Sequence, residues 1–109
     1  MSYTKFINLV RAIRSTPNFP AMDAVEEQIL NAFASAWALG RQVTVMEAME
    51  MVPDISGSTV HRRLKTLRDK GLIELDIDAI DNRVKYVVAT SLAKKYFAKL
   101  DECLVQARE

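Results

Sequence analysis

The stretch Ser56-Gly-Ser-Thr-Val-His-Arg-Arg-Leu-Lys-Thr-Leu-Arg-Asp-Lys-Gly-Leu-Ile-Glu74 decides the fold. Val60, Leu64 and Leu67 recur at helical spacing, which predicts a helix over about 57–70 with one apolar stripe. A rotation of about 100° per residue places a polar and cationic face opposite that stripe. This combination is typical of a helix that packs on a core with one side and enters the DNA major groove with the other.

Short elements flank this helix. Thr44-Val-Met-Glu47 has the form of a capping box and predicts a short helix to about Met51. Ser56 is the expected N-cap of the second helix, and Gly71 is its expected end. Beyond Gly71, apolar and acidic residues alternate, and Val84–Ala89 returns, so the sequence predicts a hairpin. The predicted fold is mainly α with a small antiparallel β-hairpin (α+β), a winged helix-turn-helix.

Further amphipathic helices are expected outside this motif. One covers 3–15 and ends at the prolines that follow it, and another covers 23–39, with Asp23 as N-cap and Gly40 as its end. A last helix covers 91–107, opened by Thr90 or Ser91. We therefore expect a single domain over 1–109, in which additional N- and C-terminal helices (3–15 and 91–107) flank a winged-helix core over 23–90.

The composition excludes several classes of protein. The 109 residues carry a net charge of +1 and one cysteine, which leaves neither a disulfide framework nor a metal-ligand cluster. No apolar run approaches the ~20 residues of a membrane span, and no signal peptide is evident at the N-terminus. We expect a cytoplasmic protein, without cofactor or metal. Catalytic motifs are missing as well, so the chain is not expected to be an enzyme.

The pattern resembles the MarR-type winged-helix transcription regulators between about Val25 and Leu100. The residues that carry the resemblance are Ser58-Thr-Val60, Leu64, Leu67, Gly71-Leu-Ile73, Asp81-x-Arg83 and Thr90 at the start of the last helix. The resemblance implies that the wing tip (81–83) lies at the minor groove, that Arg83 reaches into it, and that Asp81 holds the Arg83 side chain. It also implies a dimer through the terminal helices, whose apolar residues include Phe6, Ile7, Val10, Ile13, Phe97, Leu100 and Leu104.

The residues that we expect to contact DNA through the helix are Ser58, Thr59, His61, Arg62, Arg63 and Lys65. Arg62 and Lys65 are the best candidates for the groove. Arg63 lies closer to the apolar stripe, so it either reaches phosphates or pairs with acidic neighbours. Glu74, Asp76 and Asp78 make the first wing strand acidic, which leaves wing contact less secure than helix contact.

Two functions remain. The favoured hypothesis is a dimeric, sequence-specific regulator of bacterial type that binds a palindromic double-stranded DNA operator and acts as a repressor. No residue names an effector, whether a small molecule or a redox signal, and Cys103 is expected to pack into the dimer seam. The alternative is a winged-helix module for protein–protein interaction or assembly, without specific DNA binding.

Overall fold

The computed structural model describes residues 2–14 and 19–108, and it describes side chains for residues 3–12 and 19–107. The chain forms two compact units, Met22–Ala93 and a unit made of Met1–Ala21 with Lys94–Glu109. The last residue of the expected helix 3–15, and Pro17 after it, lie outside the described residues.

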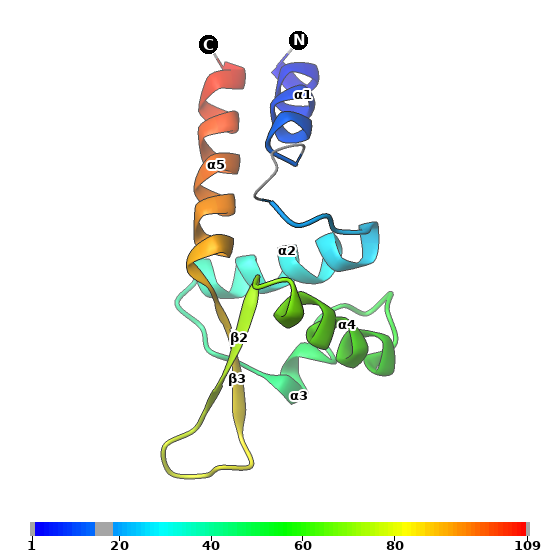
Figure 1. The fold of residues 1–109 in the computed structure, drawn as a ribbon, viewed down its shortest axis with the longest axis vertical. Helices are drawn as coiled ribbons and strands as arrows, with labels where there is room; N and C mark the ends of the chain where they lie inside the picture. Colours follow the sequence, from blue (N-terminus) through cyan, green and yellow to red (C-terminus); the bar gives the residue numbers. More distant parts are fainter. Residues whose placement is uncertain (1, 15–18, 109) are drawn as a thin grey trace. The chain divides into compact units, whose positions relative to one another are not determined.

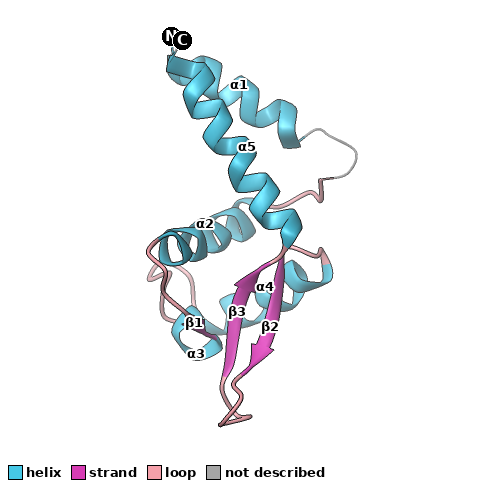
Figure 2. Cartoon of the chain, turned by 90° about the vertical axis from the view of Figure 1, so that its left-hand side faces the viewer, coloured by secondary structure: helices cyan, strands magenta, loops and turns pink. Residues whose placement is uncertain are grey.

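The unit Met22–Ala93 holds the winged helix. Its helices are α2 (Ala24–Ala38), α3 (Val45–Ala48) and α4 (Gly57–Asp69), and its strands are β1 (Val43–Thr44), β2 (Ile73–Ile77) and β3 (Lys85–Ala89). The strands form one antiparallel sheet in the order β1-β3-β2. Figures 1 and 2 both show the loop between β2 and β3 projecting beyond the helices of this unit. The predicted fold class is confirmed, and β1 adds a third strand to the expected hairpin.

The predicted N-caps are confirmed. Asp23 accepts a bond of 2.8 Å from the Glu26 backbone N–H, and the Glu26 carboxylate accepts one of 3.2 Å from the Asp23 N–H. Thr44 and Glu47 form the same reciprocal capping box at α3. Ser56 Oγ accepts from the Thr59 N–H at 3.3 Å. Each cap satisfies backbone donors that the first helical turn leaves without a partner.

Both long helices of this unit end at a glycine with positive φ. Gly40 follows α2 with φ +73°, and Gly71 follows α4 with φ +77°. After α4, the Gly71 N–H bonds to the Arg68 carbonyl and the Leu72 N–H to the Leu67 carbonyl, which is the Schellman pattern. Leu72 is therefore used to close the helix, and β2 begins one residue later than the sequence predicted.

Helix α3 is shorter than predicted, because it ends at Ala48 rather than near Met51. Beyond Ala48 the backbone makes 3₁₀-type hydrogen bonds, which span three residues instead of four. The Glu50 N–H donates to the Glu47 carbonyl, and the Met51 N–H donates to the Ala48 carbonyl. Pro53 also disfavours a helical conformation at the residue before it. The turn between α3 and α4 starts correspondingly earlier.

The core of this unit lies between α2, α4 and the sheet. The indole N–H of Trp37 donates to the Val87 carbonyl at 3.1 Å, which joins α2 to β3. The predicted stripe of α4 is buried throughout. The largest fully buried side chains are Phe33, Ile29, Leu30, Leu67, Leu72, Ile73, Val43, Val60 and Val87.

One charged side chain is buried in the described part of the chain. Glu26, on α2, is only 2% exposed, and its carboxylate accepts from Lys70 Nζ at 2.7 and 2.9 Å. Arg63 Nη1 lies 3.6 Å from the same carboxylate and 2.6 Å from Asp23. Two cations from α4 and its C-cap thus converge on the start of α2.

The second unit contains α1 (Ser2–Arg14) and most of α5 (Ser91–Arg108). The Phe19 ring, from the segment that follows α1, stacks on Tyr96 of α5 with ring centroids 4.5 Å apart. Among the described side chains of this unit, Val10, Tyr96, Cys103 and Ala107 are buried. Both predicted terminal helices are therefore present.

We predict that Glu26→Gln lowers the free energy of unfolding by about 3 kcal/mol, because it removes the buried negative charge that pairs with Lys70 at 2.7 Å. Glu50 is exposed, so Glu50→Gln is the matched control and should change stability by less than about 0.5 kcal/mol. Urea unfolding followed by circular dichroism measures both. Equal stabilities of the two variants would contradict a structural role for the buried pair.

Candidate nucleic-acid interface

The outer face of α4 presents polar and cationic side chains to solvent. Ser58, His61, Arg62 and Lys65 are all exposed, whereas Val60, Leu64 and Leu67 are buried. This division follows from the helical period, because the two sets point to opposite sides of the helix. Four of the six predicted helix contacts therefore lie together on one accessible surface.

The start of α4 is held by a chain of hydroxyl bonds. Ser56 Oγ donates to Thr59 Oγ1 at 2.8 Å, and Thr59 Oγ1 accepts from Arg62 Nη2 at 3.3 Å. Ser58 Oγ lies 3.3 Å from Ser56 Oγ. Thr59, itself half-buried, thus contacts a side chain that we expected in the major groove.

Arg63 lies on a different side of α4. Its guanidinium pairs with Asp23 and approaches Glu26, which is the pairing with acidic neighbours that the sequence left open. The backbone N–H of Glu26 lowers the pKa of Asp23, and Arg63 adds to that shift, so the carboxylate stays charged for this pair. Arg63 connects α4 to α2, and its contact with DNA stays a prediction.

The wing tip holds Arg83 as the resemblance implied. Arg83 Nε and Nη2 donate to the two Asp81 carboxylate oxygens, each at 3.1 Å. The Arg83 side chain is 88% exposed although it makes this pair. The contact lowers the pKa of Asp81 and raises that of Arg83. Asp81 therefore orients a fully charged guanidinium at the tip of the wing.

A second aspartate organises the loop behind that tip. Asp78 accepts from the Tyr86 hydroxyl at 2.7 Å and from the backbone N–H groups of Ile80 and Asp81 at 2.8 and 3.1 Å. These bonds lower the pKa of Asp78, the Tyr86 hydroxyl contributing most, and they raise the pKa of Tyr86. This acidic residue of the wing thus has a structural role in the loop.

The exposed face of α4 and the wing border a groove of about 350 Å³, the helix–wing groove. His61 of α4 lines it together with Arg83 at the wing. The full lining set is Thr44, Val45, Met46, His61, Leu75, Arg83, Val84 and Lys85. The fold thus brings together two of the predicted DNA contacts that are distant in sequence.

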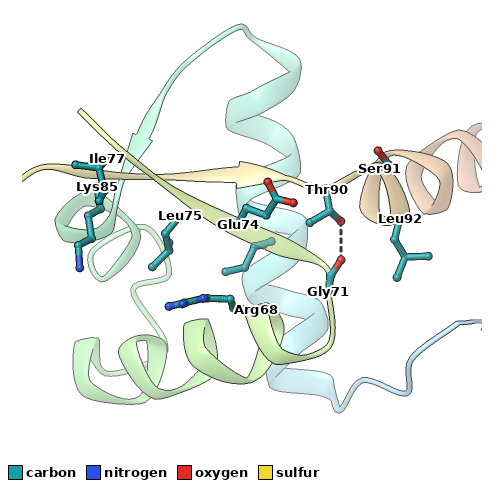
Figure 3. Close-up of a pocket in the computed structure, with 10 residues that line it drawn as sticks. Arg68, Gly71, Glu74, Leu75, Ile77, Lys85, Thr90, Ser91 and Leu92 are labelled. Atoms are coloured by element: carbon teal, nitrogen blue, oxygen red, sulfur yellow. Dashed lines mark hydrogen bonds between the residues drawn. The ribbon is translucent and has the colours of Figure 1, made fainter. Parts of the chain in front are cut away.

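A larger groove of about 700 Å³ adjoins it and shares Leu75 and Lys85. Figure 3 shows Leu75 and Lys85 extending to the side of the hairpin where Arg68 lies, whereas Glu74 extends to the other side. At the far end of this groove Thr90 Oγ1 donates to the Gly71 carbonyl at 2.7 Å and accepts from the Ala93 N–H. Thr90 is thus the cap of α5.

The residues expected in a dimer lie on α1 and α5. Phe6, Ile7, Phe97 and Leu100 are half-buried, Val10 is buried, and Leu104 is 49% exposed. The side chain of Ile13 lies outside those described. Cys103 is buried within its unit, and burial raises the pKa of its thiol, which disfavours the reactive thiolate.

Among the described residues, no group of three or more histidine, cysteine, aspartate or glutamate side chains is arranged to hold a metal ion. In the same residues, no helix is both long and apolar enough to cross a membrane.

Two contacts of this region, and the exposure of one methionine, did not follow from the sequence. The Glu26–Lys70 pair joins residues 44 positions apart, and the Tyr86–Asp78 bond depends on the strand register. Met46 is 77% exposed and lines the helix–wing groove. For Tyr86 the one sequence signal was its place on the strand that returns beside the acidic strand.

We predict that Asp78 stabilises the wing loop fully above the usual aspartate pKa of 3.8, and that this stabilisation declines below that pH and is lost as the pH falls through the lowered pKa of Asp78. The sign follows because a depressed folded-state pKa contributes stability above the unfolded-state value. Tyr86→Phe should raise the Asp78 pKa, and Tyr3→Phe, on α1, should leave it unchanged. Carbon-detected NMR titration of the Asp78 carboxyl measures this pKa in each variant. An unshifted Asp78 pKa in Tyr86→Phe would contradict the role given to the Tyr86 hydroxyl.

No protein-family model and no curated protein matches this chain. Among solved structures, it resembles a MepR variant from a multidrug-resistant S. aureus clinical isolate, with a TM-score of 0.67, 18% identity, and coverage of 98% of this chain and 70% of that one. The MarR-like transcriptional regulator Tm0816 of Thermotoga maritima matches with a TM-score of 0.60, 24% identity, and coverage of 97% and 77%.

A third similar structure is the S. aureus MepR–DNA complex, with a TM-score of 0.56, 19% identity, and coverage of 97% of this chain and 81% of that one. Identities of this size establish a shared fold. The three matches cover 97–98% of this chain. The chain therefore has the fold of the MarR-type winged-helix transcriptional regulators, as its sequence resemblance predicted.

Proposed function

We propose that this chain is a sequence-specific, double-stranded DNA-binding transcriptional regulator that acts as a dimeric repressor. Helix α4 enters the major groove with Ser58, Thr59, His61, Arg62 and Lys65, and Arg83 enters the adjacent minor groove. The whole chain works as one winged-helix domain with dimerising terminal helices. The observation that carries the proposal is the accessible polar and cationic face of α4 beside an arginine that Asp81 orients at the wing tip.

The chemistry of these side chains suits the two roles. Phosphate contacts supply most of the affinity, and hydrogen bonds to base edges supply the specificity. Arg62 offers guanidinium donors to guanine O6 and N7, and Ser58 lies near the helix N-terminus, where phosphate is favoured. Similarity in fold to MepR, which was solved as a DNA complex, adds support.

Repression is the proposed direction, because a bound DNA-binding domain blocks polymerase without needing an activation surface. A dimer would place two α4 helices in successive major grooves, about 34 Å apart, so the operator is expected to be an inverted repeat. The alternative, a protein-interaction module, draws its support from the acidic face of β2, where Glu74 and Asp76 are exposed.

Selection of bound duplexes from a random library, at two salt concentrations, tests the proposal. We expect an inverted repeat whose affinity falls steeply as salt rises. Arg62→Ala with Lys65→Ala should then weaken binding by about 3 kcal/mol, roughly a hundredfold in Kd. Lys94→Ala with Lys95→Ala, on exposed positions of α5, is the matched control and should bind as the wild type does.

Two results would count against this function. Unchanged binding by the Arg62 and Lys65 double variant would remove α4 from the major groove. If no duplex is enriched at either salt concentration, the protein-interaction module becomes the better hypothesis.

The dimer has its own test. Leu104 lies half-exposed on α5, in the same stripe as Phe97 and Leu100, so a second copy would bury it. We expect sedimentation at micromolar concentration to show a dimer, and Leu104→Asp to weaken association at least tenfold. Gln106→Asp adds the same charge at an exposed position roughly opposite on the helix and should leave the dimer intact. A monomeric wild type would contradict the palindromic operator.

A further inference from the structure

Ile80 lies in the loop that joins β2 to β3, and its side chain is almost entirely in solvent. At 97% exposed, it is the most exposed large apolar side chain in the described part of the protein. So exposed a side chain buries almost no apolar area on folding and adds little to stability. The turn itself does not need isoleucine either, because glycine, proline, asparagine, aspartate and serine are the residues that favour turns. The fold therefore leaves this side chain available for a contact outside the chain.

The backbone around Ile80 is held in place by hydrogen bonds within the wing loop (78–84). The Asp78 N–H donates to the Val84 carbonyl at 2.9 Å, and the Val84 N–H donates to the Asp81 carbonyl at 3.0 Å. The Ile80 N–H donates to the Asp78 carboxylate at 2.8 Å, and the Arg83 N–H donates to that of Asp81 at 3.0 Å. Because these bonds exist before any partner binds, the loop is preorganised and presents Ile80 at a fixed place.

The wing loop presents two exposed side chains of opposite character. Arg83 is 88% exposed in its side chain and is oriented by Asp81. Only two residues separate Ile80 from Arg83, and the loop that carries both projects beyond the helices of its unit (Figures 1 and 2). If Arg83 enters the minor groove, Ile80 is carried to the same groove. The wing loop thus offers one cationic and one apolar contact to a single stretch of DNA.

The minor groove distinguishes base pairs by one chemical group. A·T and T·A pairs present only the acceptors adenine N3 and thymine O2, which suit the donors of Arg83, whereas G·C pairs add the guanine N2 amino donor. An isoleucine side chain accepts no hydrogen bond, so packing it over that amino group would remove water and leave the donor unsatisfied. Apolar side chains are otherwise well suited to the minor groove, where isoleucine is among the residues that architectural proteins insert.

We propose that Ile80 is a specificity-determining residue, which contacts the floor of the minor groove beside Arg83 and rejects base pairs that carry the guanine amino group. The inference rests on the proposed function and adds to it a rule for the operator, namely A·T or T·A pairs under the wing loop. Arg83 supplies attraction, and Ile80 supplies discrimination by making the wrong base pair unfavourable.

The test uses the duplex recovered by library selection and changes one base pair at a time in one flank, so that the other half-site stays constant. Each flanking A·T pair is replaced by G·C and by inosine·C. Inosine lacks only the N2 amino group of guanine, so the two replacements present the same pattern in the major groove. At the pair under the wing loop, we expect the wild type to bind G·C about tenfold more weakly than A·T, and inosine·C within about twofold of A·T.

Variants assign this discrimination to the side chain. Ile80→Ala should reduce the tenfold preference to about twofold, and Ile80→Val, which keeps a branched apolar side chain, should retain most of it. Leu39→Ala is the matched control, because Leu39 is an apolar residue, 77% exposed, at the C-cap of α2. It should leave both affinity and preference unchanged. Circular dichroism of each variant verifies that the fold is retained.

Three outcomes would overturn the inference. If inosine·C binds the wild type as weakly as G·C, the amino group is not what is rejected. If Ile80→Ala keeps the tenfold preference and Arg83→Gln loses it, the discrimination belongs to Arg83. The proposed function stands in both cases. If the wild type selects no duplex, the inference fails together with the proposed function.

Discussion

The arrangement of the winged helix depends on the buried carboxylate of Glu26. Removing a carboxylate from water costs several kcal/mol unless opposite charge and hydrogen bonds surround it. Glu26 has both, because Lys70 bonds to it from the C-cap of α4 and the Asp23 N–H bonds to it within the capping box of α2. One side chain thus caps the start of α2 and holds the end of α4 against it. A displacement of α4 would separate Lys70 from Glu26, and separating the partners of a buried ion pair is strongly unfavourable.

Other contacts lock α4 at the same end. Gly71 closes the helix, and its carbonyl accepts the hydroxyl of Thr90, which in turn caps α5. Leu67 and Leu72, joined by the closing hydrogen bond, are both fully buried. The C-terminal end of α4 is therefore fixed by charge, backbone and packing together. The N-terminal half carries Ser58, His61 and Arg62 on its exposed face, where they are accessible to a partner.

What the sequence predicted well is what a few neighbouring residues determine. The caps at Asp23, Thr44 and Ser56 and the helix ends at Gly40 and Gly71 involve spans of about six residues, and each is confirmed. The Glu26–Lys70 pair, the pairing of β1 with β3 and the exposure of Met46 depend on segments brought together by folding. Periodicity predicts that a side chain faces inward or outward, but it does not identify its partner. Of the candidate interface, the outer face of α4 was therefore predictable, and the helix–wing groove was not.

The acidic first strand of the wing looked unfavourable for DNA contact, and the fold resolves the conflict by separating charges. Strand alternation puts Glu74 and Asp76 on one face of the hairpin and leaves the other face to Leu75 and Lys85. Asp78 and Asp81 lie in the loop, where Tyr86 and Arg83 respectively contact their carboxylates. A net charge of +1 consequently says little about the interface, because positive and negative groups occupy different surfaces.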